Sequence, residues 1–232
     1  MRTLLVDVRP REAYLAGHVP GAVHLDPERD LTGELGGGRH PLPSPAAFAA
    51  AAGRAGIDAD AFVLALDDGT GWAQRLWWLL RHHGHDLCGT FDVRSYAGPL
   101  QEGEERVEPV RFEPHVRTDD TIDADELHER LGAPGLVVVD ARAPERWRGE
   151  VEPIDRIAGR IPGALNAFFE QPLPVGLLDA RELVVYCGSG VTACVPLQRL
   201  ILAGHDGARL YPGSWSDWST RGLPGETGEP AG

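Results

Sequence analysis

A cysteine followed by a run of small residues is the feature of this sequence best suited to chemistry. The run reads Cys187-Gly188-Ser189-Gly190-Val191-Thr192. It follows an apolar stretch, Leu183 to Tyr186, that has the length of a buried strand. Backbone N–H groups of such a loop, and the start of a following helix, can surround the sulfur and favour the thiolate. The sequence therefore predicts that Cys187 is a nucleophile and that the five residues after it bind the substrate.

Cys187 has three other possible interpretations: a structural cysteine, the nucleophile of a phosphatase, or the nucleophile of a cysteine protease. A buried structural cysteine has no need of the Gly-Ser-Gly that follows it. Cysteine-dependent phosphatases place an arginine after five intervening residues to clamp the oxyanion, and that position is Ala193. A cysteine protease needs a histidine base, and none lies within fifteen residues of Cys187, although His18 or another histidine of the first half could reach it.

The chain repeats itself, which indicates two domains. Asp7-Val8-Arg9 and the later Gly-His-Val-Pro-Gly-Ala of residues 17–22 are matched by Asp140-Ala141-Arg142 and the Gly-Arg-Ile-Pro-Gly-Ala of residues 159–164. A second block, from Phe62 to Asp86, matches residues 182–206 at a constant offset of 120, without a gap.

Each copy alternates apolar strands with amphipathic, helix-length runs, a pattern typical of a parallel α/β sheet flanked by helices. The strands are expected at residues 4–8 and 62–66 in the first copy, and at 136–139 and 183–186 in the second. Residues 105–120 are rich in Glu and Pro, a linker composition. We expect a domain over residues 1–104, a linker over 105–120 and a second domain over 121–232, with Thr121 or Asp123 capping its first helix.

The two copies differ at the end of the second strand, where α/β folds place their ligands. Asp67 of the first copy aligns with Cys187 of the second. A carboxylate cannot serve as a sulfur nucleophile, so the first domain is predicted to be non-catalytic.

Composition excludes several classes of protein. All 22 cationic residues are arginine, which rules out enzymes that depend on a lysine amine. The formal charge of −13 disfavours nucleic acid and anionic membranes as partners. Three cysteines without metal-ligand spacing predict neither a disulfide framework nor a metal site. No apolar run is long enough for a signal peptide or a membrane span, so a soluble, cytoplasmic protein is expected.

These motifs resemble the two-domain rhodanese family of sulfurtransferases. The resemblance rests on the two Gly-x-x-Pro-Gly-Ala segments, the six-residue cysteine loop, and the stretch from Leu210 to Trp218. It implies two rhodanese-like α/β domains, of which only the second carries the cysteine. It also implies a double displacement, in which Cys187 takes a sulfane sulfur from a small-molecule donor as a persulfide and passes it to a thiol or cyanide, without a metal or organic cofactor.

The loop most resembles that of 3-mercaptopyruvate sulfurtransferases, with thiosulfate as the second choice of donor. Thiosulfate enzymes usually carry basic residues where this chain has Gly188 and Ser189. Arg146 falls where the family's substrate-binding arginine stands, and Arg156 is a weaker candidate. Arg160 replaces a histidine of the motif, and we expect it either to add a cation near the interface or to lie in solvent. The remaining alternative is a regulatory or binding module that keeps the fold; the sequence does not indicate an oligomeric state.

Overall fold

The computed structural model describes residues 2–34 and 37–229, and the chain divides into two compact units. The first unit contains Met1–Glu34 and Leu42–Arg117, and the second contains Leu35–Pro41 and Thr118–Gly232. Residues 37–41 are thus grouped with the second unit, although the chain on both sides of them belongs to the first. The division after Arg117 falls inside the Glu- and Pro-rich stretch.

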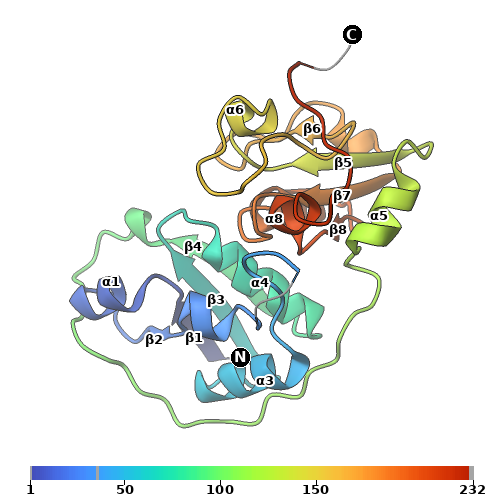
Figure 1. Ribbon diagram of the computed structural model, residues 1–232. Helices are drawn as coiled ribbons and strands as arrows, with labels where there is room; N and C mark the ends of the chain where they lie inside the picture. The colour runs from blue at the N-terminus through green and yellow to red at the C-terminus, as the bar shows by residue number, and fades with distance from the viewer. Residues whose placement is uncertain (1, 35–36, 230–232) are drawn as a thin grey trace. The chain divides into compact units, whose positions relative to one another are not determined.

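Within its described residues, the first unit is built on a four-stranded parallel sheet in the order β2-β1-β3-β4 (Figure 1). The strands are β1 (Arg2–Asp7), β2 (Val23–His24), β3 (Ala61–Asp67) and β4 (Cys88–Asp92). The helices are α1 (Arg11–Ala16), α2 (Pro27–Asp30), α3 (Pro45–Arg54), α4 (Trp72–His82) and the 3-10 helix η1 (Val93–Ser95). Residues 105–117 follow the surface of this unit, where the Val110 and Arg117 amides donate to the carbonyls of Gly53 and His82.

The described part of the second unit repeats this arrangement, with a parallel sheet in the order β6-β5-β7-β8. The strands are β5 (Leu136–Asp140), β6 (Leu165–Asn166), β7 (Glu182–Tyr186) and β8 (Arg209–Leu210). The helices are α5 (Ala124–Arg130), α6 (Pro144–Trp147), the 3-10 helix η2 (Leu177–Asp179), α7 (Cys194–Leu202) and α8 (Ser214–Trp218). Asp123 caps α5 by accepting from the Glu126 amide at 2.8 Å. The predicted α/β fold, with a parallel sheet in each repeat, is confirmed.

The repeated sequence motifs have a common structural role in the two units. In the first unit the Arg9 guanidinium pairs with Asp7 at 2.6 Å and donates to the Gly17 carbonyl at 2.8 Å. In the second, Arg142 pairs with Asp140 at 2.6 Å and donates to the Gly159 carbonyl at 2.7 Å. Each arginine therefore ties the end of the central strand to the glycine that opens the Pro-Gly-Ala turn.

The core of the second unit packs aromatic side chains of the C-terminal stretch against the sheet. Tyr186 of β7, Tyr211, Trp215 and Trp218 are almost completely buried in one cluster with Leu127 of α5. This packing fixes the residues after β8 against the end of β7, where Cys187 begins its loop. The strand and the segment that surrounds its end are thus held by the same core.

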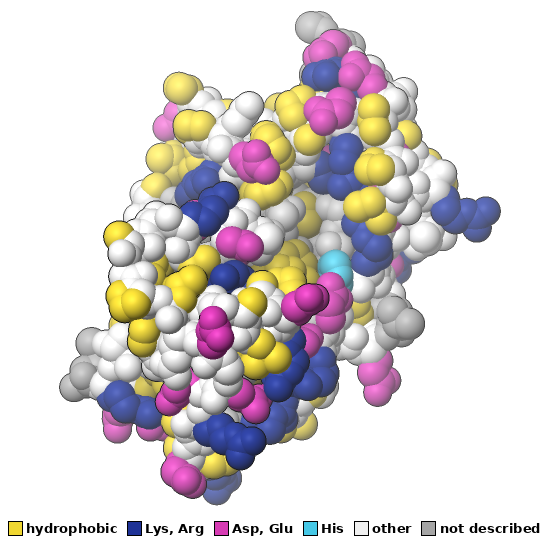
Figure 2. Space-filling view, turned by 90° about the vertical axis from the view of Figure 1, so that its left-hand side faces the viewer, with side chains coloured by type: hydrophobic (Ala, Val, Ile, Leu, Met, Phe, Trp, Pro, Cys, Tyr) yellow, Lys and Arg dark blue, Asp and Glu magenta, His cyan; other side chains and the backbone are white. Residues whose placement is uncertain are grey.

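The surface carries charges of both signs. On the face shown in Figure 2, arginine side chains lie among acidic ones. Ion pairs of the described residues include Arg117–Asp86 and Arg148–Glu150. No helix in the described part of the chain is long and apolar enough to cross a membrane.

Candidate active site

Cys187 lies immediately after β7, at the carboxyl end of the sheet of the second unit. Leu183 to Tyr186 of the strand are buried, and only 1% of Cys187 is exposed. The residues after it form a bend and a turn, and helix α7 begins at Cys194. Because parallel strands direct their carboxyl ends to the same edge, this is where the fold places ligand-binding loops.

Two backbone amides of the loop donate to the sulfur of Cys187. The Gly190 N–H lies 3.1 Å from Sγ, and the Ser189 N–H lies 3.5 Å away. The loop can turn this way because Gly190 adopts a φ of +82°, and a Cβ there would lie 2.5 Å from the Pro212 carbonyl oxygen. Both amides are positioned to stabilise negative charge on the sulfur.

The first residues of α8 hold the cysteine loop from the other side. The Ser214 hydroxyl accepts from the Cys187 amide at 3.1 Å, and the Trp215 amide donates to the Cys187 carbonyl at 2.9 Å. The Ser216 amide donates to the Gly188 carbonyl at 3.0 Å. Ser214 has a φ of +56°, a left-handed conformation that non-glycine residues seldom adopt. This backbone conformation costs about 1–3 kcal/mol, and the hydrogen bonds around Ser214 hold the residue in it.

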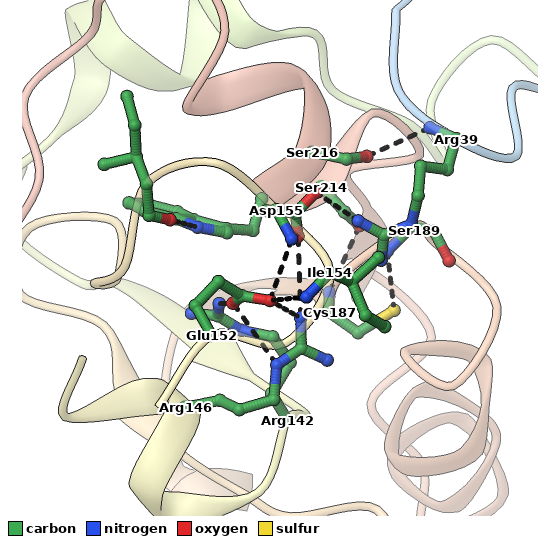
Figure 3. A network of polar contacts seen from close by, with 12 residues as sticks. Arg39, Arg142, Arg146, Glu152, Ile154, Asp155, Cys187, Ser189, Ser214 and Ser216 are labelled. Carbon is green, nitrogen blue, oxygen red and sulfur yellow. Dashed lines mark hydrogen bonds and ion pairs between the residues drawn. The ribbon is translucent and has the colours of Figure 1, made fainter. Parts of the chain in front are cut away.

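Arg146, the predicted substrate-binding arginine, extends from α6 to the region beside the cysteine loop (Figure 3). Glu152 accepts from its Nη2 at 2.6 Å and from Arg142 at 3.2 Å, and Asp155 lies 3.5 Å from the same Nη2. Burial raises the pKa of Glu152, but hydrogen bonds from Arg146 and from the Asp155 and Ile154 amides outweigh it, so the pKa is lowered. Glu152 is therefore a charged, nearly buried group that fixes the orientation of Arg146.

Residues 37–41 bring two further side chains to the site. The His40 ring Nδ1 lies 2.7 Å from the Ser189 hydroxyl, 149 positions away in the sequence. The Arg39 guanidinium pairs with Asp155, and its backbone amide donates to the Ser216 hydroxyl at 3.0 Å. The sequence predicts only that His18 or another histidine of the first half could reach Cys187, and it singles out neither Arg39 nor His40. His18 is fully buried in the first unit with Nδ1 against the Tyr14 carbonyl.

The other predicted loop residues lie as follows. Gly188 lies next to the side chains of Arg39 and Arg146. If Gly188 had a Cβ atom, this atom would lie 3.5 Å from both Nη1 and Nη2 of Arg146. Ser189 and Val191 are buried, and Thr192 is half-buried. Among the described residues, neither Val191 nor Thr192 forms a hydrogen bond to the sulfur of Cys187. Arg156 is exposed, whereas its neighbour Asp155 faces the site. Any substrate contact of these residues stays a prediction.

Arg160 does not lie in solvent. Only 3% of it is exposed, and its guanidinium carbon lies 4.3 Å from the centroid of the Trp147 ring. Nη1 donates to the Gly228 carbonyl at 2.6 Å, and Nη2 lies 3.4 Å from Glu226. Arg160 therefore holds the C-terminal segment against the second unit, a partner that no local sequence pattern could indicate.

In the first unit a carboxylate fills the place of the thiol. Asp67 is 2% exposed, and its oxygens accept from the amides of Gly69, Gly71 and Ala73 at 2.8 to 3.2 Å. The Thr70 hydroxyl donates to it at 3.1 Å. The equivalent loop of the repeat therefore also directs backbone donors at the side chain in this position, and the Gly69 amide is the counterpart of the Ser189 amide.

The other two cysteines are placed differently from Cys187. Burial raises the pKa of Cys88 to about 12, so its thiol stays protonated near neutral pH. Cys194 is fully buried and lies 3.4 Å from the Gly190 carbonyl, as expected for core packing. Within the described residues, His, Cys, Asp and Glu form no group of three or more that could hold a metal ion.

The repeated α/β units, of which the second has a cysteine held by loop amides at the edge of its sheet, define a tandem-domain α/β protein. The rhodanese-like domain model matches residues 1–105 and again residues 123–221, and the chain belongs to the rhodanese family.

Its relatives are sulfurtransferases. A Pseudomonas aeruginosa protein named "Probable 3-mercaptopyruvate sulfurtransferase" is 43% identical over 89% of this chain and 83% of its own length. The 3-mercaptopyruvate sulfotransferase structure of SseA from Escherichia coli is 28% identical, covers 92% of this chain and 93% of that one, and superposes with a TM-score of 0.78. A solved structure named "Probable Thiosulfate Sulfurtransferase" is 30% identical over 97% of both chains, with a TM-score of 0.68. The chain is therefore a sulfurtransferase.

Proposed function

We propose that this enzyme moves a sulfur atom from 3-mercaptopyruvate to a thiol or cyanide by way of a persulfide on Cys187. The observation that carries the proposal is the pair of amides, from Ser189 and Gly190, that donate to Sγ of Cys187. A thiolate and a persulfide anion have the same charge, so amides that stabilise the first also stabilise the second.

In the first half of the reaction, the Cys187 thiolate attacks the sulfur of the donor. The bond between that sulfur and carbon 3 of mercaptopyruvate breaks, and its electron pair leaves with the carbon as the enolate of pyruvate. The proton of the donor thiol then passes to the enolate carbon. The products are pyruvate and a Cys187 persulfide anion, so that charge and atoms balance.

In the second half, the outer sulfur of the persulfide is transferred and the Cys187 thiolate returns. Cyanide attacks this sulfur, the S–S bond breaks with its electrons on Sγ, and thiocyanate leaves. A thiol acceptor reacts in the same way and becomes a persulfide, while its proton stays on the product. No outside oxidant or reductant is required.

The Ser189 hydroxyl and His40 are proposed to carry the proton between donor sulfur and carbon. The Ser189 hydroxyl lies 2.7 Å from the His40 ring, and the amide of the same serine donates to Sγ of Cys187. Histidine changes protonation near neutral pH, which suits it to this transfer.

The preference for mercaptopyruvate over thiosulfate is supported by the charges next to the cysteine. Gly188 and Ser189 supply no cation within the loop itself. Arg146, fixed by Glu152 at 2.6 Å, offers a planar array of N–H donors that suits a carboxylate. We assign catalysis to the second domain, residues 121–232 by the boundaries expected above, because the first has Asp67 in place of the cysteine, and this side chain accepts from the Gly69 amide, the counterpart of the Ser189 amide. Three free cysteines favour a reducing, cytoplasmic setting.

The test is thiocyanate formation from cyanide, with mercaptopyruvate and thiosulfate as separate donors. Wild type is expected to turn over with mercaptopyruvate, and Cys187→Ser is expected to lose this activity. The matched control Cys194→Ser changes a buried thiol of the same unit. Turnover that survives in Cys187→Ser would refute the nucleophile, and a tenfold higher kcat/KM with thiosulfate would refute the proposed donor.

A further inference from the structure

The segment of residues 37–41 is seated closely against the cysteine-bearing unit. Gly38 has a φ of +107°, and a Cβ there would lie 2.6 Å from the Gly213 carbonyl oxygen, so only glycine fits without a shift of backbone. The next residue, Arg39, donates its amide to the Ser216 hydroxyl at 3.0 Å. The backbone of Arg39 is thus fixed beside the residues of α8 that hold Cys187.

The Arg39 side chain occupies the space above Gly188. A Cβ at Gly188 would lie 2.7 Å from Nη2 of Arg39, closer than van der Waals contact permits. The two terminal nitrogens of Arg146 lie 3.5 Å from the same point. Two guanidinium groups from distant parts of the chain therefore converge next to the residue that follows Cys187, where this loop has no side chain of its own.

Asp155 orients this pair of arginines. One of its oxygens pairs with Nη1 of Arg39, and the other lies 3.5 Å from Nη2 of Arg146 (Figure 3). Arg39 thus uses Nη1 for Asp155, while Nη2 is directed at Gly188. The Arg39 and Arg146 side chains keep 29% and 17% of their surface exposed, which leaves them accessible to a small anion. Paired guanidinium groups suit a carboxylate, since each offers several N–H donors in a planar array.

We propose that Arg39 is a second donor-binding arginine, which binds the donor's carboxylate together with Arg146 from the space that a side chain at position 188 would fill. This inference rests on the proposed function, because it assigns the recognition of that donor. It also explains the glycine at position 188: the cation comes from a remote segment, and a larger residue in the loop would displace it.

The first experiment separates recognition of the carboxylate from a structural role. Arg39→Gln is compared with wild type using mercaptopyruvate and using 1-mercapto-2-propanone, which has a methyl group in place of the carboxylate. The expected result is a loss of about tenfold to hundredfold in kcat/KM for mercaptopyruvate, the usual effect of removing a charge-assisted hydrogen bond, with little change for the neutral donor. Arg148→Gln is the matched control, because Arg148 is an ion-paired arginine of similar exposure.

An equal loss with both donors would mean that Arg39 only supports the structure, and an unchanged kcat/KM with mercaptopyruvate would refute any role in binding. Absence of Cys187-dependent turnover in wild type is a different outcome, which would refute the proposed function and this inference with it.

A second experiment tests the shared space above Gly188 by a double-mutant cycle. Gly188→Ala is expected to lower kcat/KM for mercaptopyruvate severalfold in wild type, because the added Cβ displaces Nη2 of Arg39. In the Arg39→Gln background the same substitution is expected to have little effect, since the group it displaces is gone. Additive losses in the cycle would contradict the proposal.

Discussion

Replacing Gly190 by alanine tests how the loop stabilises the sulfur of Cys187. Gly190 has a φ of +82°, and a Cβ would lie 2.5 Å from the carbonyl oxygen and 3.2 Å from the carbonyl carbon of Pro212. The obstacle is backbone, which cannot rotate away as a side chain would. Either the loop or the segment from Pro212 to Ser214 must shift, and the Gly190 amide leaves its position 3.1 Å from Sγ.

Gly190→Ala is expected to lower both the stability of the protein and its catalytic rate. Alanine in a left-handed conformation costs about 1–2 kcal/mol of stability. Loss of one hydrogen bond to a charged sulfur costs about 1.5–3 kcal/mol of the stabilisation available to thiolate and persulfide. Because 1.36 kcal/mol corresponds to a factor of ten in rate, Gly190→Ala is expected to lower kcat/KM by about 10- to 150-fold.

The measurement is kcat/KM for mercaptopyruvate together with the free energy of unfolding, and the control is Gly204→Ala. Gly204 has a φ of +97°, but a Cβ there meets nothing within 4 Å. The control is expected to lose similar stability from its backbone and to keep its kcat/KM. If Gly190→Ala also kept full activity, the two amides could not be what stabilises the sulfur.

Four more predictions concern Glu152, Asp67 and Cys88. Glu152→Gln is expected to raise KM for mercaptopyruvate severalfold, since it weakens the 2.6 Å bond that orients Arg146; an unchanged KM would contradict this. Because the pKa of Glu152 is below its ordinary value of 4.5 in the folded protein, the ionised carboxylate stabilises the fold fully above pH 4.5. This stabilisation is lost as the pH falls through the lowered pKa of the folded state. Glu152→Gln is therefore expected to lose less unfolding free energy than wild type when both are titrated with acid. Asp67→Asn is expected to reduce unfolding free energy by about 1–3 kcal/mol, because an amide group cannot accept as many of the loop's hydrogen bonds, with kcat/KM retained; a catalytic defect would show that the first unit takes part. Cys88, with a pKa of about 12, should react slowly with iodoacetamide at pH 8, and fast labelling would refute its protonated state.

The repeat in the sequence explains why so much of the fold could be predicted. The sequences around β3 and β7 align without a gap, which predicts that Asp67 and Cys187 lie at equivalent strand ends. In the structure Asp67 is the last residue of β3, and Cys187 directly follows β7. Periodicity and turn residues are local signals, and they determine strands and loops of this length. The position of the cysteine loop followed from the same signals.

The residues that complete the site could not be predicted in this way. His40 and Arg39 lie in a part of the chain without a counterpart in the repeat, and they reach the site through tertiary contacts with Ser189 and Asp155. The one available signal was the glycine run followed by Arg-His-Pro, because chemically active residues between glycine and proline indicate a shaped loop. Glu152 lies four residues before Arg156, and its role depends on burial, which the sequence does not show.

The central claim is that Cys187 carries the transferred sulfur, and mass spectrometry of the donor-treated enzyme tests it most directly. The protein is treated with mercaptopyruvate in the absence of acceptor, alkylated, digested and compared with untreated protein and with Cys187→Ser. The predicted result is one added sulfur on the peptide that contains Cys187, which disappears when cyanide is added. An added sulfur on Cys88 or Cys194 alone, or none on any peptide of an enzyme that turns over, would contradict the mechanism.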